Sequence, residues 1–323
     1  MASLPTRSPT AAAPTGGRAA AAGTSSGDAE RAPLDPEQLA AIRRIALRAR
    51  RLATQFVAGD YRSVFRGTGM EFAEVREYIP GDDVRFIDWN VTARLGAPWV
   101  KEYVEERELA VLCAVDLSAS QEAASPGAGR LGTAAEVVAL MSFAALFNND
   151  RAGLMTFTDR VERFVAPAKG SRHVLRIVRE IVHPAPGALG TDIGAACEHL
   201  SRVLARRSVV VLVSDFLAAG YERSLAALSR RHEVIAVTLV DALDLALPRL
   251  GIIEVEDAER GGRVLLDTDD ARVRRRYEQA ASERAAARRR ALVSAGVDEI
   301  ELRVGEAVVG PLVAYFRRRA LAR

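Results

Sequence analysis

Cysteine and histidine are scarce in this chain of 323 residues, which contains two cysteines and four histidines. Cys113 and Cys197 are too few for a disulfide framework, and they form no CxxC pair of the kind that binds zinc. No two histidines stand at metal-ligand spacing, and each lies on a separate predicted element. Free thiols, in a sequence without an apolar leader segment near Met1, favour a reducing compartment. We therefore expect a cytoplasmic protein.

Long apolar runs and a strong charge imbalance are also missing. No stretch approaches the roughly 18 consecutive apolar residues of a transmembrane helix, so we expect no membrane span. Lysine and arginine together number 45 against 42 acidic residues, and an excess of that size does not indicate a nucleic-acid partner. The remaining composition, 49% hydrophobic and 27% charged, is that of a folded globular protein.

Five segments follow one another along the chain. Residues 1–33 consist mainly of Ala, Pro, Thr, Ser and Gly, which cannot bury enough apolar surface to fold, so we expect a disordered tail. Residues 34–60 have apolar residues at helical spacing and predict an N-terminal helix. Residues 61–108 are rich in glycine, charge and aromatics, which indicates short strands and ordered loops packed on the core. We assign 109–256 to one α/β domain and 257–323 to a hairpin, a basic helix and a final strand and helix.

Short apolar runs alternate with helical patterns from residue 109 onward. Such alternation predicts an α/β fold, an open and mainly parallel sheet of the Rossmann type with helices on both faces, preceded here by an ordered irregular or β segment. The predicted strands are 109–115, 152–157, 161–165, 208–213, 234–240, 252–255, 264–266 and 300–304. The predicted helices are about 131–148, 171–182, 193–206, 221–231, 270–293 and 308–321.

Oxygen-bearing side chains follow three of these elements. Asp116, Ser118 and Ser120 come directly after the first buried strand, at alternating positions. Thr191 precedes the helix that starts near 193, and Asp215 follows the strand 208–213. Ligands of open parallel sheets bind beyond the carboxyl ends of the strands, so the five side chains should share one edge. Carboxylate and hydroxyl oxygens are hard donors, which suit Mg²⁺ in an octahedral site with an open position.

The ordered set DxSxS, then threonine, then aspartate resembles the metal-ion-dependent adhesion site of von Willebrand factor A domains. The resemblance implies a bound Mg²⁺ or Mn²⁺ that completes its shell with a carboxylate from a partner protein. The alternative interpretation is that the five oxygens only cap helices and stabilise loops, since Asp and Ser are common at strand ends.

A segment upstream is similar to the signature of a second family. It reads GTGMEFAEVREYIPGDDVRFIDWNVTAR from Gly67 to Arg94 and continues with Lys101-Glu102-Tyr103 and Glu105-Glu106-Arg107-Glu108. This pattern resembles that of the bacterial domain-of-unknown-function 58 family, which pairs it with a von Willebrand factor A-like domain. Members are commonly encoded beside MoxR-type AAA+ ATPases. The resemblance, over about 61–216, implies an adaptor or substrate-recognition partner of such an ATPase in the assembly or maturation of protein complexes.

Charged and aromatic side chains in this segment have a structural interpretation. The acids that follow Pro80-Gly81 should belong to a turn and pair with nearby arginines, and the tryptophans should pack the segment against the sheet. The residues concerned are Asp82, Asp83 and Asp88, then Arg76, Arg85 and Arg94, and finally Trp89 and Trp99.

Two functions are compatible with the sequence. The first is a non-enzymatic binding module whose ion receives an acidic side chain from the ATPase or from its client. The second is a metal-dependent hydrolase of phosphate esters, with Asp116 or Asp215 as ligand or nucleophile. A hydrolase needs a general base or a second metal, and no clear candidate is present, so we favour the binding module. The arginine-rich helix over 270–293 is interpreted as a solvated face, and the alternative is contact with nucleic acid or an acidic partner.

Overall fold

The structure is a computed structural model that describes residues 36–56, 69–106, 109–118, 129–183, 190–256 and 262–321. The chain divides into two units, 1–35 and 36–323, and every described residue belongs to the second. The tail predicted over 1–33 lies outside the described residues.

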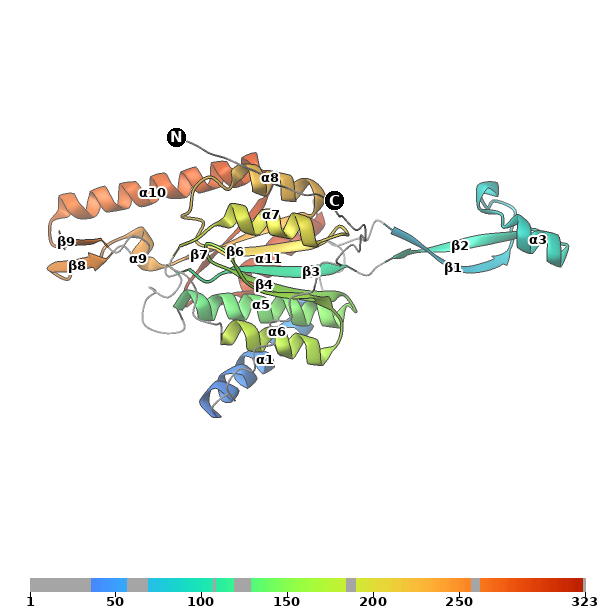
Figure 1. Ribbon diagram of the computed structural model, residues 1–323, viewed down its shortest axis with the longest axis horizontal. Helices are drawn as coiled ribbons and strands as arrows, with labels where there is room; N and C mark the ends of the chain where they lie inside the picture. Colours follow the sequence, from blue (N-terminus) through green and yellow to red (C-terminus); the bar gives the residue numbers. More distant parts are fainter. Residues whose placement is uncertain are drawn as a thin grey trace, which may run out of the picture. The chain divides into compact units, whose positions relative to one another are not determined.

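A six-stranded sheet forms the centre of the second unit (Figure 1). Its strand order is β10-β7-β6-β3-β4-β5, and all neighbouring pairs are parallel except β4 and β5. The turn between β4 and β5, closed by a 2.8 Å bond from Thr158 N to Arg160 O, is too short for a parallel crossover, so β5 returns antiparallel. The strands are β3 (Ala110–Asp116), β4 (Arg151–Phe157), β5 (Val161–Ala168), β6 (Val209–Ser214), β7 (Glu233–Val240) and β10 (Asp298–Arg303).

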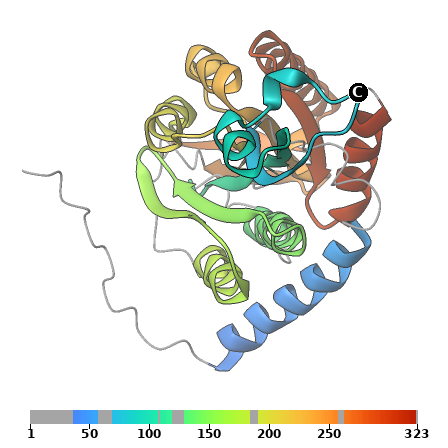
Figure 2. The same ribbon diagram turned by 90° about the vertical axis from the view of Figure 1, so that its right-hand side faces the viewer.

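Helices cover both faces of this sheet, as the alternating pattern predicts (Figures 1 and 2). One face carries α1 (Pro36–Phe56), α5 (Gly129–Phe147) and α6 (Ser171–Val182). The other carries α7 (Ile193–Val203), α8 (Glu222–Arg231) and α10 (Ala271–Ser294), and α11 (Val309–Leu321) packs on β10. Because both faces are covered, β3, β6 and β7 are almost wholly buried and consist of continuous apolar runs. The fold is therefore α/β with a mainly parallel sheet.

The helix α5 is the most apolar of those in the described part of the chain. By length and composition it could cross a membrane, but 72% of its apolar window is buried inside the protein. Small residues such as Ala139, Ala144 and Ala145 are fully buried on it and let the helix approach β3 and β4 closely. Its apolar character is therefore that of a core helix between the sheet and α1.

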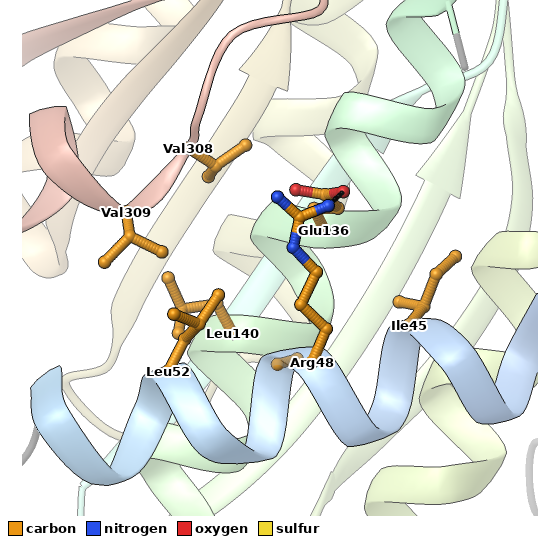
Figure 3. Close-up of a pocket in the computed structure, with 8 residues that line it drawn as sticks. Ile45, Arg48, Leu52, Glu136, Leu140, Val308 and Val309 are labelled. Carbon is orange, nitrogen blue, oxygen red and sulfur yellow. Dashed lines mark hydrogen bonds and ion pairs between the residues drawn. The ribbon is translucent and has the colours of Figure 1, made fainter. Parts of the chain in front are cut away.

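The helix α1 packs on α5 through its small residues, since Ala46, Ala49 and Ala53 are all buried. A shallow apolar pocket beside this contact is bordered by an ion pair between Arg48 and Glu136 at 3.0 Å (Figure 3). The other labelled residues there are Ile45, Leu52, Leu140, Val308 and Val309, from α1, α5 and the start of α11. The N-terminal helix predicted over 34–60 is thus confirmed for Pro36–Phe56.

The segment before the sheet forms a β-ribbon with a structured tip. Its strands β1 (Gly69–Glu77) and β2 (Trp99–Glu106) pair antiparallel, and η2 (Val84–Phe86) and α3 (Trp89–Leu95) lie between them. Arg76 binds Asp82 with two hydrogen bonds of 2.7 and 2.8 Å, and Arg85 pairs with Asp83, as predicted.

Two expectations for the ribbon were wrong. Asp88 caps α3 through Asn90 N and pairs with Lys101 at 3.4 Å, where an arginine partner was expected. Trp89 is 70% exposed, so it does not pack the segment against the sheet. Trp89 lies in the first turn of the seven-residue helix α3, and no residue of that helix is buried.

After β7 the chain forms the short helix α9 (Ala242–Leu245) and a hairpin of β8 (Ile252–Glu256) and β9 (Arg263–Asp267). The hairpin and the helix α10 that follows agree with the sequence prediction. Asp241 caps α9 by accepting a 2.9 Å bond from Leu243 N. These elements place charged side chains beside the carboxyl ends of β6 and β7, where the candidate site lies.

Candidate metal centre

Asp116 is the last residue of β3 and is only 1% exposed. Both of its carboxylate oxygens accept hydrogen bonds: Oδ1 from Ser118 N at 2.9 Å and Oδ2 from the Ser214 hydroxyl at 2.7 Å. Strands β3 and β6 are paired in parallel through Val115 and Val213, and this register brings Ser214 opposite Asp116. The two adjacent strand ends therefore hold the carboxylate in one orientation.

Asp215 follows Ser214 and is 4% exposed. Its Oδ1 accepts a 3.1 Å bond from Leu217 N, while its Oδ2 is buried and has no hydrogen-bond partner among the described residues. The turn depends on Phe216, a non-glycine residue at φ 55° whose N–H donates to Ser214 Oγ at 3.0 Å. Such left-handed backbone costs on the order of 1–3 kcal/mol and persists where packing fixes it. Here the Phe216 ring packs edge-on against Tyr221 at 5.9 Å.

Thr191 reaches the same edge through β4. Leu117 N donates to Phe157 O at 2.8 Å, and Asp192 N donates to Thr158 O at 2.9 Å, so both loops attach to the end of β4. The Thr191 hydroxyl oxygen is buried and, within the described part of the chain, has no hydrogen-bond partner. A buried polar atom without a partner costs about 1–3 kcal/mol, so a ligand that bound Thr191 Oγ1 and Asp215 Oδ2 would remove that cost.

The environment of Asp116 disfavours its negative charge. Burial raises its pKa, and the charge of Asp215 raises it further. The hydrogen bonds from Ser118 and Ser214 act in the opposite direction, and the resulting pKa is about 6. A divalent cation at this edge would offset the repulsion between the two carboxylates, because it supplies the missing positive charge.

The structure brings most of the predicted set together. Asp116, Ser118, Thr191 and Asp215 all lie at the carboxyl ends of β3, β4 and β6 or in loops attached to them. Ser118 is fully buried, whereas Ser120 lies outside the described residues. In the described part of the chain no three His, Cys, Asp or Glu side chains gather as a metal-binding group. Any ion here would therefore depend on hydroxyl oxygens as well as on two carboxylates. The donors that are present, hard and partly unpartnered, fit Mg²⁺ or Mn²⁺.

One residue that contacts Asp116 lies outside the predicted set. Ser214 donates a hydrogen bond to Asp116, whereas only its neighbour Asp215 was predicted from the sequence. The available signal was its position as the final residue of a buried strand that pairs with the strand of Asp116.

Comparison with protein families assigns this chain to a family. Residues 74–287 match the family described as protein of unknown function DUF58. The chain belongs to this family. The matched part of the DUF58 chain contains most of the ribbon as well as Asp116, Thr191 and Asp215.

Mycobacterial proteins align with this DUF58 chain over most of their own length. Uncharacterised proteins of Mycobacterium bovis and Mycobacterium tuberculosis are each 31% identical over 294 residues, covering 89% of this chain and 92% of theirs. An uncharacterised protein of Mycobacterium avium is 32% identical over 158 residues, which cover 47% of this chain and 92% of that protein.

Solved structures resemble this DUF58 chain only weakly. The conserved hypothetical protein BatB of Bacteroides thetaiotaomicron has 13% identity and a TM-score of 0.42, covering 66% of this chain and 99% of that one. An aerotolerance-related membrane protein of Bacteroides fragilis has 16% identity and a TM-score of 0.39, covering 67% and 100%. Structural similarity at these TM-scores and identities gives no information about activity.

Proposed function

We propose that the chain is a non-enzymatic protein-binding module that depends on a divalent metal ion, Mg²⁺ or Mn²⁺. The observation that carries this proposal is a pair of buried oxygens at the edge of the sheet that holds Asp116. Thr191 Oγ1 and Asp215 Oδ2 have no hydrogen-bond partner among the described residues. The order of Asp116, Ser118, Ser120, Thr191 and Asp215 adds the resemblance to the adhesion site of von Willebrand factor A domains.

Each residue has a separate role in this proposal. Asp116 and Asp215 supply negative charge, and Ser214 and the Ser118 N–H keep the Asp116 carboxylate oriented. The hydroxyls of Thr191 and Ser118 supply neutral oxygens, so that the net charge of the site stays compatible with an incoming anion. The ion, when bound, acts as a Lewis acid with a coordination position for a carboxylate of the partner protein.

The partner in this proposal is a MoxR-type AAA+ ATPase, its client, or both, in the assembly or maturation of protein complexes. Support comes from the family membership together with the resemblance of the segment 67–108, whose folded tip would add a second contact surface. A cytoplasmic location is part of the proposal, and its support is that Cys113 and Cys197 are both free and buried.

The hydrolase alternative needs a proton acceptor beside the site. His173 Nε2 is within 2.9 Å of Ala152 O, and burial lowers the pKa of His232, which stands near Arg231 and Arg207. Neither histidine contacts Asp116 or Asp215 in the described part of the chain, so neither is placed as a base for hydrolysis.

The test is affinity capture with the full chain as bait, in Mg²⁺ and in EDTA, with wild type, Asp116→Ala and Asp241→Asn. Asp241 is a matched control, because it is a buried aspartate at the end of the neighbouring strand β7 but outside the proposed set. Recovery of an AAA+ ATPase by wild type and the control in Mg²⁺, and its loss in EDTA and with Asp116→Ala, supports the proposal. The proposal is rejected if the ATPase is recovered equally in Mg²⁺ and in EDTA and equally by wild type and Asp116→Ala. Hydrolysis of p-nitrophenyl phosphate that requires Asp116 would favour the hydrolase instead.

A further inference from the structure

A cleft of about 240 Å³ opens beside Asp215, between α10 and the ends of β7 and β10. Asp215 itself forms part of its wall. The cleft therefore shares Asp215 with the candidate metal centre, and its other charged side chains come from elements outside that centre. Those other charged residues are Arg284, Arg288, Arg289, Arg303, Asp244 and Glu301.

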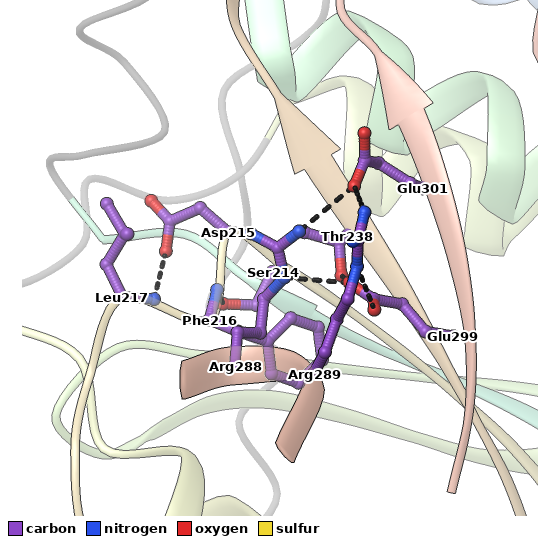
Figure 4. Close-up of polar contacts among 9 residues, drawn as sticks. All are labelled: Ser214, Asp215, Phe216, Leu217, Thr238, Arg288, Arg289, Glu299 and Glu301. Carbon is purple, nitrogen blue, oxygen red and sulfur yellow. Dashed lines mark hydrogen bonds and ion pairs between the residues drawn. The ribbon is translucent and has the colours of Figure 1, made fainter. Parts of the chain in front are cut away.

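Two of the arginines are occupied within the protein. Arg288 is 9% exposed and binds Glu299 at 2.7 Å and Glu301 at 3.1 Å. Arg289 lies 3.9 and 3.5 Å from the same two glutamates. Figure 4 shows both guanidinium groups directed at Glu299 and Glu301, while the carboxylate of Asp215 points away from them. This cluster fixes α10 against β10 and forms the rigid floor of the cleft.

The other two arginines, Arg284 and Arg303, have no close ion pair among the described residues. Arg284 stacks over the Tyr277 ring at 5.8 Å and has no ion pair with any described carboxylate. Within the described part of the chain Arg303 is paired only with Glu306, at 4.0 Å, and both side chains are more than 60% exposed. A loose, exposed pair of this kind contributes at most about 1 kcal/mol, so it yields readily to a better acceptor.

We propose that this cleft receives an acidic segment of the protein partner, with a first carboxylate at the Asp116–Asp215 site and a second carboxylate held by Arg284 and Arg303. The first contact rests on the proposed function. The second contact is new, and it would select partners with two acidic residues close together in sequence. Guanidinium groups suit this task because their planar fork matches a carboxylate with two parallel hydrogen bonds.

The cleft favours a peptide over other anions. Its volume is below the roughly 300–1,000 Å³ of typical small-molecule sites. None of the described residues that line it is aromatic, so these residues offer a nucleic-acid base no stacking surface. Asp215, Asp244 and Glu301 would also repel a continuous phosphate backbone, whereas two separate carboxylates can avoid them.

The test uses fluorescein-labelled decapeptides of glycine and serine, read by fluorescence anisotropy with the full chain in Mg²⁺ at low salt. One peptide contains a single glutamate, and a series contains two glutamates separated by one to four residues. We expect the best two-glutamate peptide to bind about threefold to tenfold more tightly than the single-glutamate peptide, the gain of one or two exposed ion pairs. In Arg284→Gln/Arg303→Gln this gain should vanish, and the affinity for the single-glutamate peptide should stay unchanged.

The matched control is Arg275→Gln/Arg276→Gln, which removes the same charge from exposed positions of α10 that do not line the cleft. It should keep the preference for two glutamates. The inference is overturned if both double variants lose the preference for two glutamates equally, or if wild type shows no such preference. It is also overturned if a dT oligonucleotide of equal charge binds more tightly than the peptides and this binding is lost in Arg284→Gln/Arg303→Gln. The proposed function is read separately, from the effect of EDTA on the single-glutamate peptide. Absence of binding by every peptide overturns both.

Discussion

The substitution Asp116→Asn should stabilise the protein in the absence of metal at neutral pH. Burial and the charge of Asp215 raise the pKa of Asp116 from 3.8 to about 6. A difference of about 2 pKa units corresponds to roughly 3 kcal/mol by which the ionised form is disfavoured in the folded state. Asparagine removes this charge but accepts only one of the two hydrogen bonds, from Ser118 N and Ser214 Oγ, which costs about 1–1.5 kcal/mol. The net expected gain is about 1.5–2 kcal/mol.

The pH dependence fixes the sign of this argument. A carboxyl group whose pKa is raised on folding contributes stability that is complete below its unfolded pKa of 3.8 and is lost as the pH rises through about 6. Wild type without metal should therefore lose stability between about pH 4 and pH 6 through this group, whereas Asp116→Asn should not. The advantage of the variant should be largest at pH 7.5 and close to zero at pH 4.5.

Urea denaturation in EDTA at pH 4.5 and pH 7.5, followed by far-UV circular dichroism, measures both quantities. Asp241→Asn serves as the control, because it also neutralises a buried aspartate at a strand end but should bring no such gain at pH 7.5. The reasoning is refuted if Asp116→Asn is less stable than wild type at pH 7.5, or if the difference between them is the same at both pH values. In excess Mg²⁺ the order should reverse, since only wild type gains binding energy.

Three further predictions concern the rest of the molecule. Arg288→Ala should lower the free energy of unfolding by about 1.5–3 kcal/mol, because it removes the short charged hydrogen bonds to Glu299 and Glu301 and leaves them the longer contacts of Arg289. The exposed Arg289→Ala should cost less than about 1 kcal/mol, and urea titrations compare the two variants. Phe157→Ala should lower the free energy of unfolding by about 3–5 kcal/mol, because Phe157 is fully buried in the core. Trp89→Ala, at a position that is 70% exposed, should change it by less than about 0.5 kcal/mol. Equal losses of stability in thermal melts would contradict the difference in burial between the two rings. Thr191→Ala should weaken Mn²⁺ binding by about tenfold to a hundredfold without unfolding the protein, the scale of one charge-assisted bond, and unchanged affinity in calorimetry would remove Thr191 from the site.

Periodicity allowed most of the α/β unit to be predicted from sequence. The runs that became β3, β6 and β7 are continuous and apolar because both faces of the sheet are covered, and this signal is local. The segment 69–106 has no such signal, since its ribbon and tip depend on pairing between β1 and β2 and on specific ion pairs. Trp89 was misjudged for the same reason, because exposure of an aromatic ring follows from tertiary packing.

The sequence predicted that Asp116, Ser118, Thr191 and Asp215 share one edge of the sheet, but it did not predict their hydrogen bonds. Strand ends of a parallel sheet meet at one edge whatever the details, which is why Asp116 and Asp215 could be placed together. The hydrogen bond from Ser214 to Asp116 depends on the register between β3 and β6, and strand register could not be predicted from the sequence. The cleft of Arg284 and Arg303 was also missed, since it arises where α10 crosses the ends of β7 and β10.

Calorimetric titration of Mg²⁺ and Mn²⁺ into the metal-free full chain tests the central claim most directly. We predict one bound ion per wild-type chain at pH 7.5, with affinity falling as the pH drops below about 6, because protons compete for Asp116. Asp116→Ala should bind no ion and keep the wild-type circular dichroism spectrum, and Asp241→Asn should bind as wild type does. Equal binding by wild type and Asp116→Ala, or no binding by wild type at any pH, would contradict the assignment of a metal centre at these strand ends.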